Sequence, residues 1–132
     1  QDNIFDLTQL ILTKKIDQAR DLVKDLTLQG EDEIKLIAIM LGQFRLYTQV
    51  KILQESGQTE SQMVSSLGHY LGRNPNPYQI KFALRDTRGL SLNFLQDSIR
   101  YLIQADYQIK TGVYEKNYLF ERALLQIASQ SN

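Results

Sequence analysis

Both prolines of this 132-residue chain lie in one short stretch, GRNPNPY at residues 72–78. Proline breaks a helix because it lacks an amide hydrogen and clashes with the preceding turn. Outside this stretch, apolar residues recur at helical spacing, and no segment alternates convincingly at a period of two. The sequence therefore predicts an all-α fold, built as a single compact domain of six or seven helices.

Capping residues and glycines place the helix ends. Thr59 and Gln62 can form a capping box, Asn76 and Ser91 are typical N-cap residues, and Gly68 is expected to stop the helix that begins at Thr59. The expected helices span roughly residues 4–12, 14–28, 32–56, 59–67, 77–88, 92–111 and 115–129.

The third expected helix is apolar at nearly every position between Ile34 and Leu41. A helix that is apolar all round is buried, so this one is expected to be central to the core or to face another subunit. No apolar run approaches the roughly 20 residues that a transmembrane helix needs, so no membrane partner is expected. The N-terminus also lacks a basic segment followed by an apolar core, the pattern of a signal peptide.

The composition excludes several kinds of site. No cysteine is present, which rules out disulfides and thiolate metal sites, and fifteen basic residues balance fifteen acidic ones. His69 is the only histidine, and neither a metal-ligand spacing nor a phosphate-binding glycine motif accompanies it. We therefore expect no catalytic residue, no metal and no cofactor in this chain.

The triplet Lys110-Thr111-Gly112 also occurs in serine β-lactamases, where it acts with a Ser-x-x-Lys nucleophile and a Ser-Asp-Asn element. This chain contains neither element. We therefore interpret the triplet as a helix end. In this interpretation Lys110 complements the helix dipole, Thr111 closes the last turn, and Gly112 takes the left-handed conformation.

A carboxylate lies in the predicted buried stripe of the sixth helix. Asp106 could be reached by Lys110, four residues on, but we predict that it pairs with Arg45 of the third helix and fixes the register of the two helices. The alternative is that Asp106 and Arg45 both point to solvent. The other residues of the predicted stripe are Leu92, Leu95, Ile99, Leu102, Ile103 and Ile109.

The fifth helix has a basic side. Lys81, Arg85 and Arg88 follow one another at i, i+4 and i+7, and with Arg73 nearby they could contact phosphates. The alternative is an ordinary solvated helix face. Tyr78 and Phe82 are expected on the apolar side of the same helix.

Four segments together resemble the bacterial DNA polymerase III delta subunit family, specifically its C-terminal helical domain. They are DNIFDLTQLIL, GEDEIKLIAIMLGQFRLYTQVKIL, PYQIKFAL and ADYQIKTG, at residues 2–12, 30–53, 77–84 and 105–112. The combination of QFR with AD-x-x-IKTG at this separation carries most of the resemblance, which covers about residues 3–128.

The resemblance implies a role in the clamp loader, the ATP-driven bacterial complex that opens the sliding clamp and places it on primed DNA. Residues 1–132 would be the collar, or oligomerisation, domain. The ATPase-like module and the clamp-binding region would lie outside this chain. The expected partners are delta prime and gamma or tau type subunits in the cytoplasm, with the clamp and primed DNA reached only through the complete subunit or complex.

The last two helices supply the candidates for subunit contact. They are Tyr101, Tyr114, Tyr118 and Leu125, and the alternative for all four is core packing. A second hypothesis is a helical nucleic-acid-binding domain that uses the basic side of the fifth helix. Salt-dependent binding of primed DNA by the isolated chain would distinguish the two hypotheses.

Overall fold

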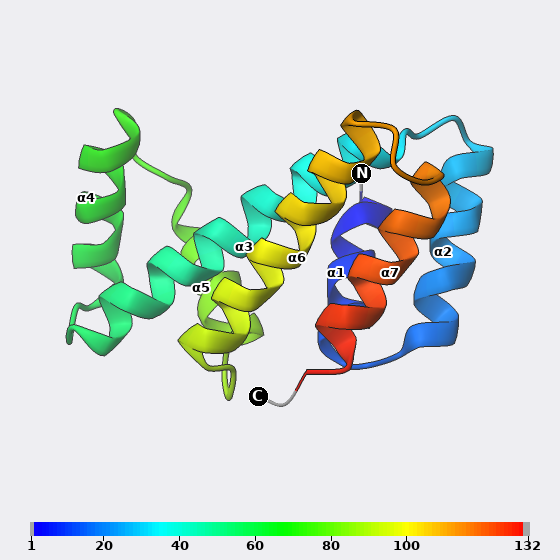
Figure 1. Cartoon of the computed structure of the whole chain (residues 1–132). Helices are drawn as coiled ribbons and strands as arrows, with labels where there is room; N and C mark the ends of the chain where they lie inside the picture. The colour runs from blue at the N-terminus through cyan, green and yellow to red at the C-terminus, as the bar shows by residue number, and fades with distance from the viewer. Residues whose placement is uncertain (1, 131–132) are drawn as a thin grey trace.

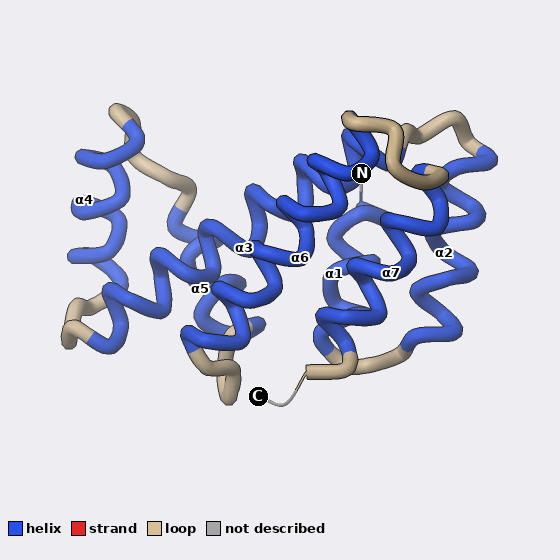
Figure 2. Tube along the Cα trace, viewed as in Figure 1, coloured by secondary structure: helices blue, strands red, loops and turns tan. Residues whose placement is uncertain are grey.

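The computed structural model describes residues 2–130, which form helices and loops and, within that range, no strand (Figure 1, Figure 2). The elements are α1 (Asp2–Leu12), α2 (Ile16–Leu28), α3 (Glu33–Glu55), α4 (Glu60–Leu71), α5 (Pro77–Asp86), α6 (Leu92–Lys110) and α7 (Lys116–Ala128). This arrangement confirms the predicted all-α class and the single compact helical domain.

Helix α3 is the central element of the fold. It lies alongside α6 across the middle of the molecule and also contacts α1, α4, α5 and α7 (Figure 1). By length and composition alone α3 could cross a membrane, which the sequence analysis did not anticipate. Its buried side chains include Leu36, Met40 and Phe44, each without exposed surface. The apolar character of α3 is therefore that of a core helix with neighbours on several sides.

The helices at one end of the molecule are α1, α2 and α7, which contact one another (Figure 1). Lys14, between α1 and α2, has a positive φ of 62°. Its Nζ donates hydrogen bonds to the carbonyls of Ala128 at 2.7 Å and Gln130 at 2.8 Å. A cation is favourable at this end of a helix because it complements the free carbonyls and the helix dipole. Lys14 thus fastens the end of α7 to the turn before α2.

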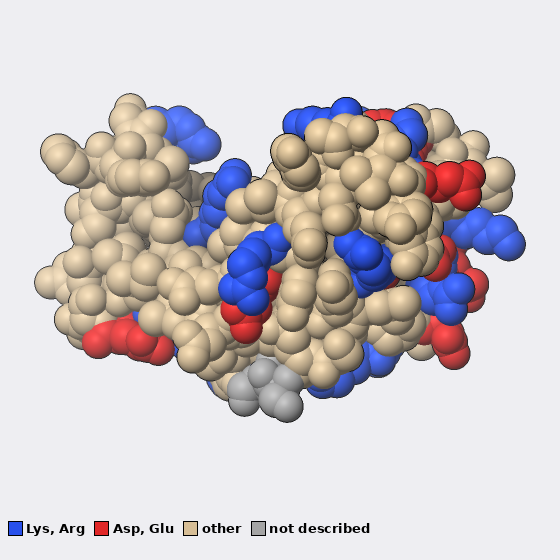
Figure 3. Space-filling model, in the orientation of Figure 1, with Lys and Arg blue, Asp and Glu red and all other residues tan. Residues whose placement is uncertain are grey.

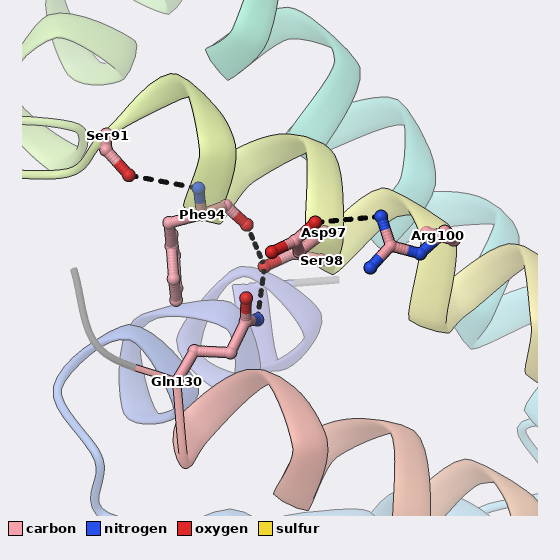
Figure 4. Close-up of polar contacts among 6 residues, drawn as sticks. All are labelled: Ser91, Phe94, Asp97, Ser98, Arg100 and Gln130. Carbon is pink, nitrogen blue, oxygen red and sulfur yellow. Dashed lines mark hydrogen bonds and ion pairs between the residues drawn. The ribbon is translucent and has the colours of Figure 1, made fainter.

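The start of α6 is fixed by side-chain hydrogen bonds that also reach the end of α7. Ser91 caps α6 by accepting a hydrogen bond from the Phe94 amide at 3.0 Å (Figure 4). The buried Ser98 hydroxyl donates to the Phe94 carbonyl at 2.7 Å and accepts from Gln130 Nε2 at 3.3 Å. These contacts join the segment that follows α7 to the first turns of α6.

Helix α4 stands apart at the other end of the molecule and contacts only α3 and α5 extensively (Figure 1). The prediction that Gly68 stops this helix is wrong, because α4 continues to Leu71 and ends at Gly72, which has a φ of 76°. A glycine is favoured at position 68 for a different reason, the close approach of Asn74. A Cβ at Gly68 would clash with Asn74 Oδ1 and lie 3.3 Å from Asn74 Cα, so glycine allows the following loop to pack against α4.

Candidate interaction surfaces

The triplet Lys110-Thr111-Gly112 lies at the end of α6. Gly112 has a φ of 71°, and the amide of Val113 donates a hydrogen bond to the carbonyl of Gln108 at 3.1 Å. This six-residue closure is the Schellman motif, in which the left-handed residue follows the C-cap. Thr111 is that C-cap residue, and the triplet thus has a structural position at a helix terminus.

The single histidine, His69, is exposed near the end of α4. Over residues 2–130, the structure contains no group of three or more histidine, aspartate or glutamate side chains arranged to hold a metal ion.

The predicted ion pair between Asp106 and Arg45 is not formed. The Asp106 carboxylate contacts Lys110 Nζ at 2.9 Å, one turn along α6, and Arg45 is exposed on α3. The buried stripe of α6 runs through Leu102 and Ala105, so Asp106 lies at its edge with 26% of its side chain exposed. A carboxylate that is partly exposed and already paired with a lysine one turn away needs no partner from another helix.

The four candidate contact residues have different environments. Tyr114, Tyr118 and Leu125 are exposed by 61%, 54% and 42%, whereas Tyr101 is partly buried and packs against the core. The rings of Tyr114 and Tyr118 meet edge to face, with centroids 5.8 Å apart. Of the four residues predicted as contact candidates, three are therefore exposed on α7 or just before it, and one packs against the core.

Sequence reasoning missed further exposed apolar residues on α6 and on its connection to α7. Ile103, Tyr107 and Val113 are exposed by 46%, 66% and 49%, although Ile103 was expected in the buried stripe. Six exposed apolar or aromatic residues thus lie on α6, on α7 and on their connection, and we call them the α6–α7 surface: Ile103, Tyr107, Val113, Tyr114, Tyr118 and Leu125. Figure 3 shows a broad area without charged side chains over these two helices, interrupted and bordered by basic and acidic side chains.

Arg122 joins the two helices within the α6–α7 surface. Its Nη2 donates a hydrogen bond to Gln108 Oε1 at 2.6 Å, and its guanidinium lies 5.9 Å from the centre of the Tyr118 ring. The Nε atom of Arg122 is buried and has no hydrogen-bond partner. Tyrosine and arginine are among the residue types that are enriched where protein interfaces derive most of their binding energy.

A second surface lies on the outer side of α5. Lys81 and Arg85 on α5, and Arg88 in the turn that follows it, are all exposed, as the sequence predicted for a solvated or ligand-contacting side. The expectation that Tyr78 and Phe82 are on the buried side is wrong, because they are exposed by 65% and 50%. We call these five residues the α5 surface. Its buried side is formed instead by Ile80 and Ala83.

The acidic residue at the end of α5 is engaged by two neighbours. Asp86 accepts a hydrogen bond from the Tyr47 hydroxyl at 3.1 Å and from Arg85 Nε at 3.0 Å. The pKa of Tyr47 is raised above its ordinary value, first because the phenol is buried and second because the Asp86 charge disfavours a tyrosinate. Arg85 is thereby held with its guanidinium 4.9 Å from the centre of the Phe82 ring.

A groove of about 610 Å³ opens beside the α5 surface. Its walls come from α1 and α5, and its floor comes from α3, where Gly42 leaves open space above the helix. Its lining residues include Phe5, Asp6, Gln9, Gln43, Phe82 and Asp86. The sequence reasoning missed this groove. Two features of the sequence could have indicated the groove: Gly42 in the middle of an apolar helix, and Phe5 and Phe82, which the core does not cover.

Comparison with known proteins gives consistent matches. Residues 1–127 match the family model described as DNA polymerase III delta subunit, C-terminal domain. The chain is 33% identical over 131 residues to the DNA polymerase III subunit delta of Bacillus subtilis (strain 168), covering 99% of this chain and 36% of that protein. A solved structure, the Bacillus subtilis DNA clamp loader delta protein, superimposes with a TM-score of 0.82 over 97% of this chain and 36% of that one. The chain thus spans about a third of the length of these relatives.

Proposed function

Since this chain belongs to the DNA polymerase III delta subunit family, as a match to its C-terminal domain, we propose that it is the assembly domain of a bacterial clamp-loader delta subunit. Its role would be to hold the delta subunit in a collar with the other subunits, while the opening of the clamp is carried out elsewhere in the subunit. The proposed location is the bacterial cytoplasm.

The observation that carries this proposal is the α6–α7 surface. Six large apolar or aromatic side chains are at least 42% exposed on two adjacent helices and their connection. Exposed aromatic residues that cluster, rather than occur singly, mark protein interaction sites. Tyr118 and Arg122 supply the residue types that most often anchor such an interface.

The proposed partners are other clamp-loader subunits of the delta prime and gamma or tau types. An assembly domain needs stiff helices and exposed apolar surface, and it needs no reacting groups. The long α3–α6 pair supplies the stiffness, because both helices are anchored by fully buried residues such as Phe44 and Leu102. No catalytic activity is proposed for this chain.

The experiment that tests the proposal is size-exclusion chromatography with light scattering. The chain is run alone and then mixed with the complete delta prime and gamma subunits of the same bacterium. We expect a stoichiometric complex with the wild-type chain. A Leu125→Asp variant should weaken that complex at least about tenfold, because a carboxylate buried in an interface without a partner is costly.

Leu71→Asp is the matched control. Leu71 is 43% exposed, close to the 42% of Leu125, but it lies at the end of α4. The proposal requires Leu71→Asp to assemble like the wild type. Equal loss of the complex in both variants, or no complex with the wild-type chain, would contradict it.

A further inference from the structure

The net charge of zero conceals a basic region. From Ser61 to Gln96 the sequence contains four lysines or arginines and one acidic residue, Asp86. The basic residues are Arg73, Lys81, Arg85 and Arg88. The Asp86 side chain is only 9% exposed and is occupied by Tyr47 and Arg85. The segment that contains α5 therefore carries a net positive charge and is flanked along the chain by Glu60 and Asp97.

Aromatic rings lie among these charges. Tyr78 and Phe82 are one turn apart on α5, with ring centroids 6.4 Å apart, and both are at least half exposed. Lys81 lies beside them in the sequence, and Arg85 stacks over Phe82. Exposed aromatic rings interleaved with basic side chains are the arrangement that binds single-stranded nucleic acid, because bases stack on rings while phosphates contact cations.

The groove beside Phe82 extends this arrangement. Gln9 and Gln43 line it, and an amide side chain can donate and accept hydrogen bonds at the edge of a base. Asp6 lines the groove on α1 and repels phosphates from that side, whereas Asp86, which lines it on the α5 side, is paired with Arg85 and accepts a hydrogen bond from Tyr47. A strand would accordingly follow the basic α5 side of the groove rather than the α1 side.

We propose that the α5 surface, with the adjoining groove, binds single-stranded DNA. Lys81, Arg85 and Arg88 contact phosphates, and Tyr78 and Phe82 stack on bases. This binding is separate from subunit assembly, which is assigned to the α6–α7 surface, so the chain has one surface for protein and another for nucleic acid.

The test is fluorescence anisotropy of a labelled oligothymidylate of about 16 nucleotides, titrated with the 132-residue chain at about 50 mM salt. We expect saturable binding below about 100 μM. The combined variant Lys81→Ala, Arg85→Ala, Arg88→Ala should lower the slope of log affinity against log salt by about 2, because each lost phosphate contact removes about 0.7.

The matched control removes three basic residues elsewhere. Arg20, Lys24 and Lys35 are exposed on α2 and α3, and their triple alanine variant changes the net charge by the same amount. We expect the control to keep the wild-type salt slope. Equal losses in the two triple variants would overturn the proposal, because binding would then depend on net charge alone.

Stacking is tested separately with Phe82→Ala. The expected loss is at least about fivefold in affinity with the salt slope unchanged, because a stacking contact carries no counterion. Tyr107→Ala, a comparably exposed tyrosine on α6, should bind like the wild type. The single-strand assignment would be contradicted if duplex DNA bound with equal affinity. It would also be contradicted if polyglutamate competed fully with the oligonucleotide and Phe82→Ala had no effect.

The two proposals fail independently. Leu125→Asp should bind the oligonucleotide normally, and the α5 triple variant should still form the subunit complex. No anisotropy change with the wild-type chain at about 100 μM would overturn the DNA site and leave the assembly role untouched.

Discussion

The α6–α7 surface and the α5 surface differ in chemistry although both rest on α3. The first is built from large apolar and aromatic side chains such as Tyr118 and Leu125, in a part of the molecule where Figure 3 shows a broad area without charged side chains. The second places cations among aromatic rings along the short helix α5 and in the turn that follows it. Under the two proposals above, this difference in chemistry corresponds to two different partners, a protein subunit and single-stranded DNA.

Phe44→Ala should have the largest effect and should affect both surfaces together. Phe44 is completely buried on α3, the helix that contacts both α5 and α6. Truncating a buried phenylalanine lowers the free energy of unfolding by about 3–5 kcal/mol. Urea denaturation measures this loss. Ile52→Ala, at a 44% exposed position of the same helix, should cost less than about 1 kcal/mol. Similar costs for the two variants would mean that α3 is not the common support.

Tyr47→Phe should act on the α5 side alone. It removes the hydroxyl that donates to the nearly buried Asp86, so we expect a loss of about 1–2 kcal/mol in the free energy of unfolding. Complex formation with the partner subunits should be unchanged. Loss of the complex in this variant would contradict the separation of the two surfaces.

The same residue gives a pH test. The pKa of Tyr47 is raised in the folded state, because burial and the Asp86 charge disfavour tyrosinate. Its contribution to stability is therefore complete below the unfolded pKa of about 10 and is lost as the pH rises above that value. In urea denaturation at increasing pH, the wild type should lose stability more steeply than Tyr47→Phe. Parallel curves would contradict the assigned hydrogen bond.

Lys14→Met should have the smallest effect and should act at the end of α7. It keeps most of the apolar stem but removes the cation that caps the carbonyls of Ala128 and Gln130. We expect a loss of about 1 kcal/mol in the free energy of unfolding, since the cap is partly exposed to solvent. Lys15→Met, at the neighbouring exposed position, is the control and should change stability little. An equal loss in both variants would show that the cap is not specific to Lys14.

Local features of the fold could be predicted from the sequence. Ser91, Asn76 and the Thr59–Gln62 capping box all make the hydrogen bonds that their sequence positions indicated. Such caps depend only on residues within one turn, so they need no knowledge of the other helices. Gly68 was misread because a glycine that ends a helix and a glycine that allows close packing look alike in a sequence.

Features that depend on two elements could not be predicted. Helical spacing grouped Tyr78 and Phe82 with Ile80 and Ala83, but the positions of α3 and α4 decide which of them is covered. The Asp106–Arg45 pair failed for the same reason, since the relative rotation of α3 and α6 is set by their packing. In the sequence, the exposed apolar residues of the α6–α7 surface have the same helical spacing as residues of a buried stripe. Only the packing of the neighbouring helices in the folded structure shows that they are uncovered.

Hydrogen–deuterium exchange of the chain, free and bound to the complete partner subunits, tests the central assignment most directly. If the α6–α7 surface is the assembly surface, binding should slow exchange in peptides from the second half of α6 through α7, and it should leave α4 unchanged. Protection confined to α4 or α5, with α6 and α7 unaffected in a stoichiometric complex, would contradict the assignment.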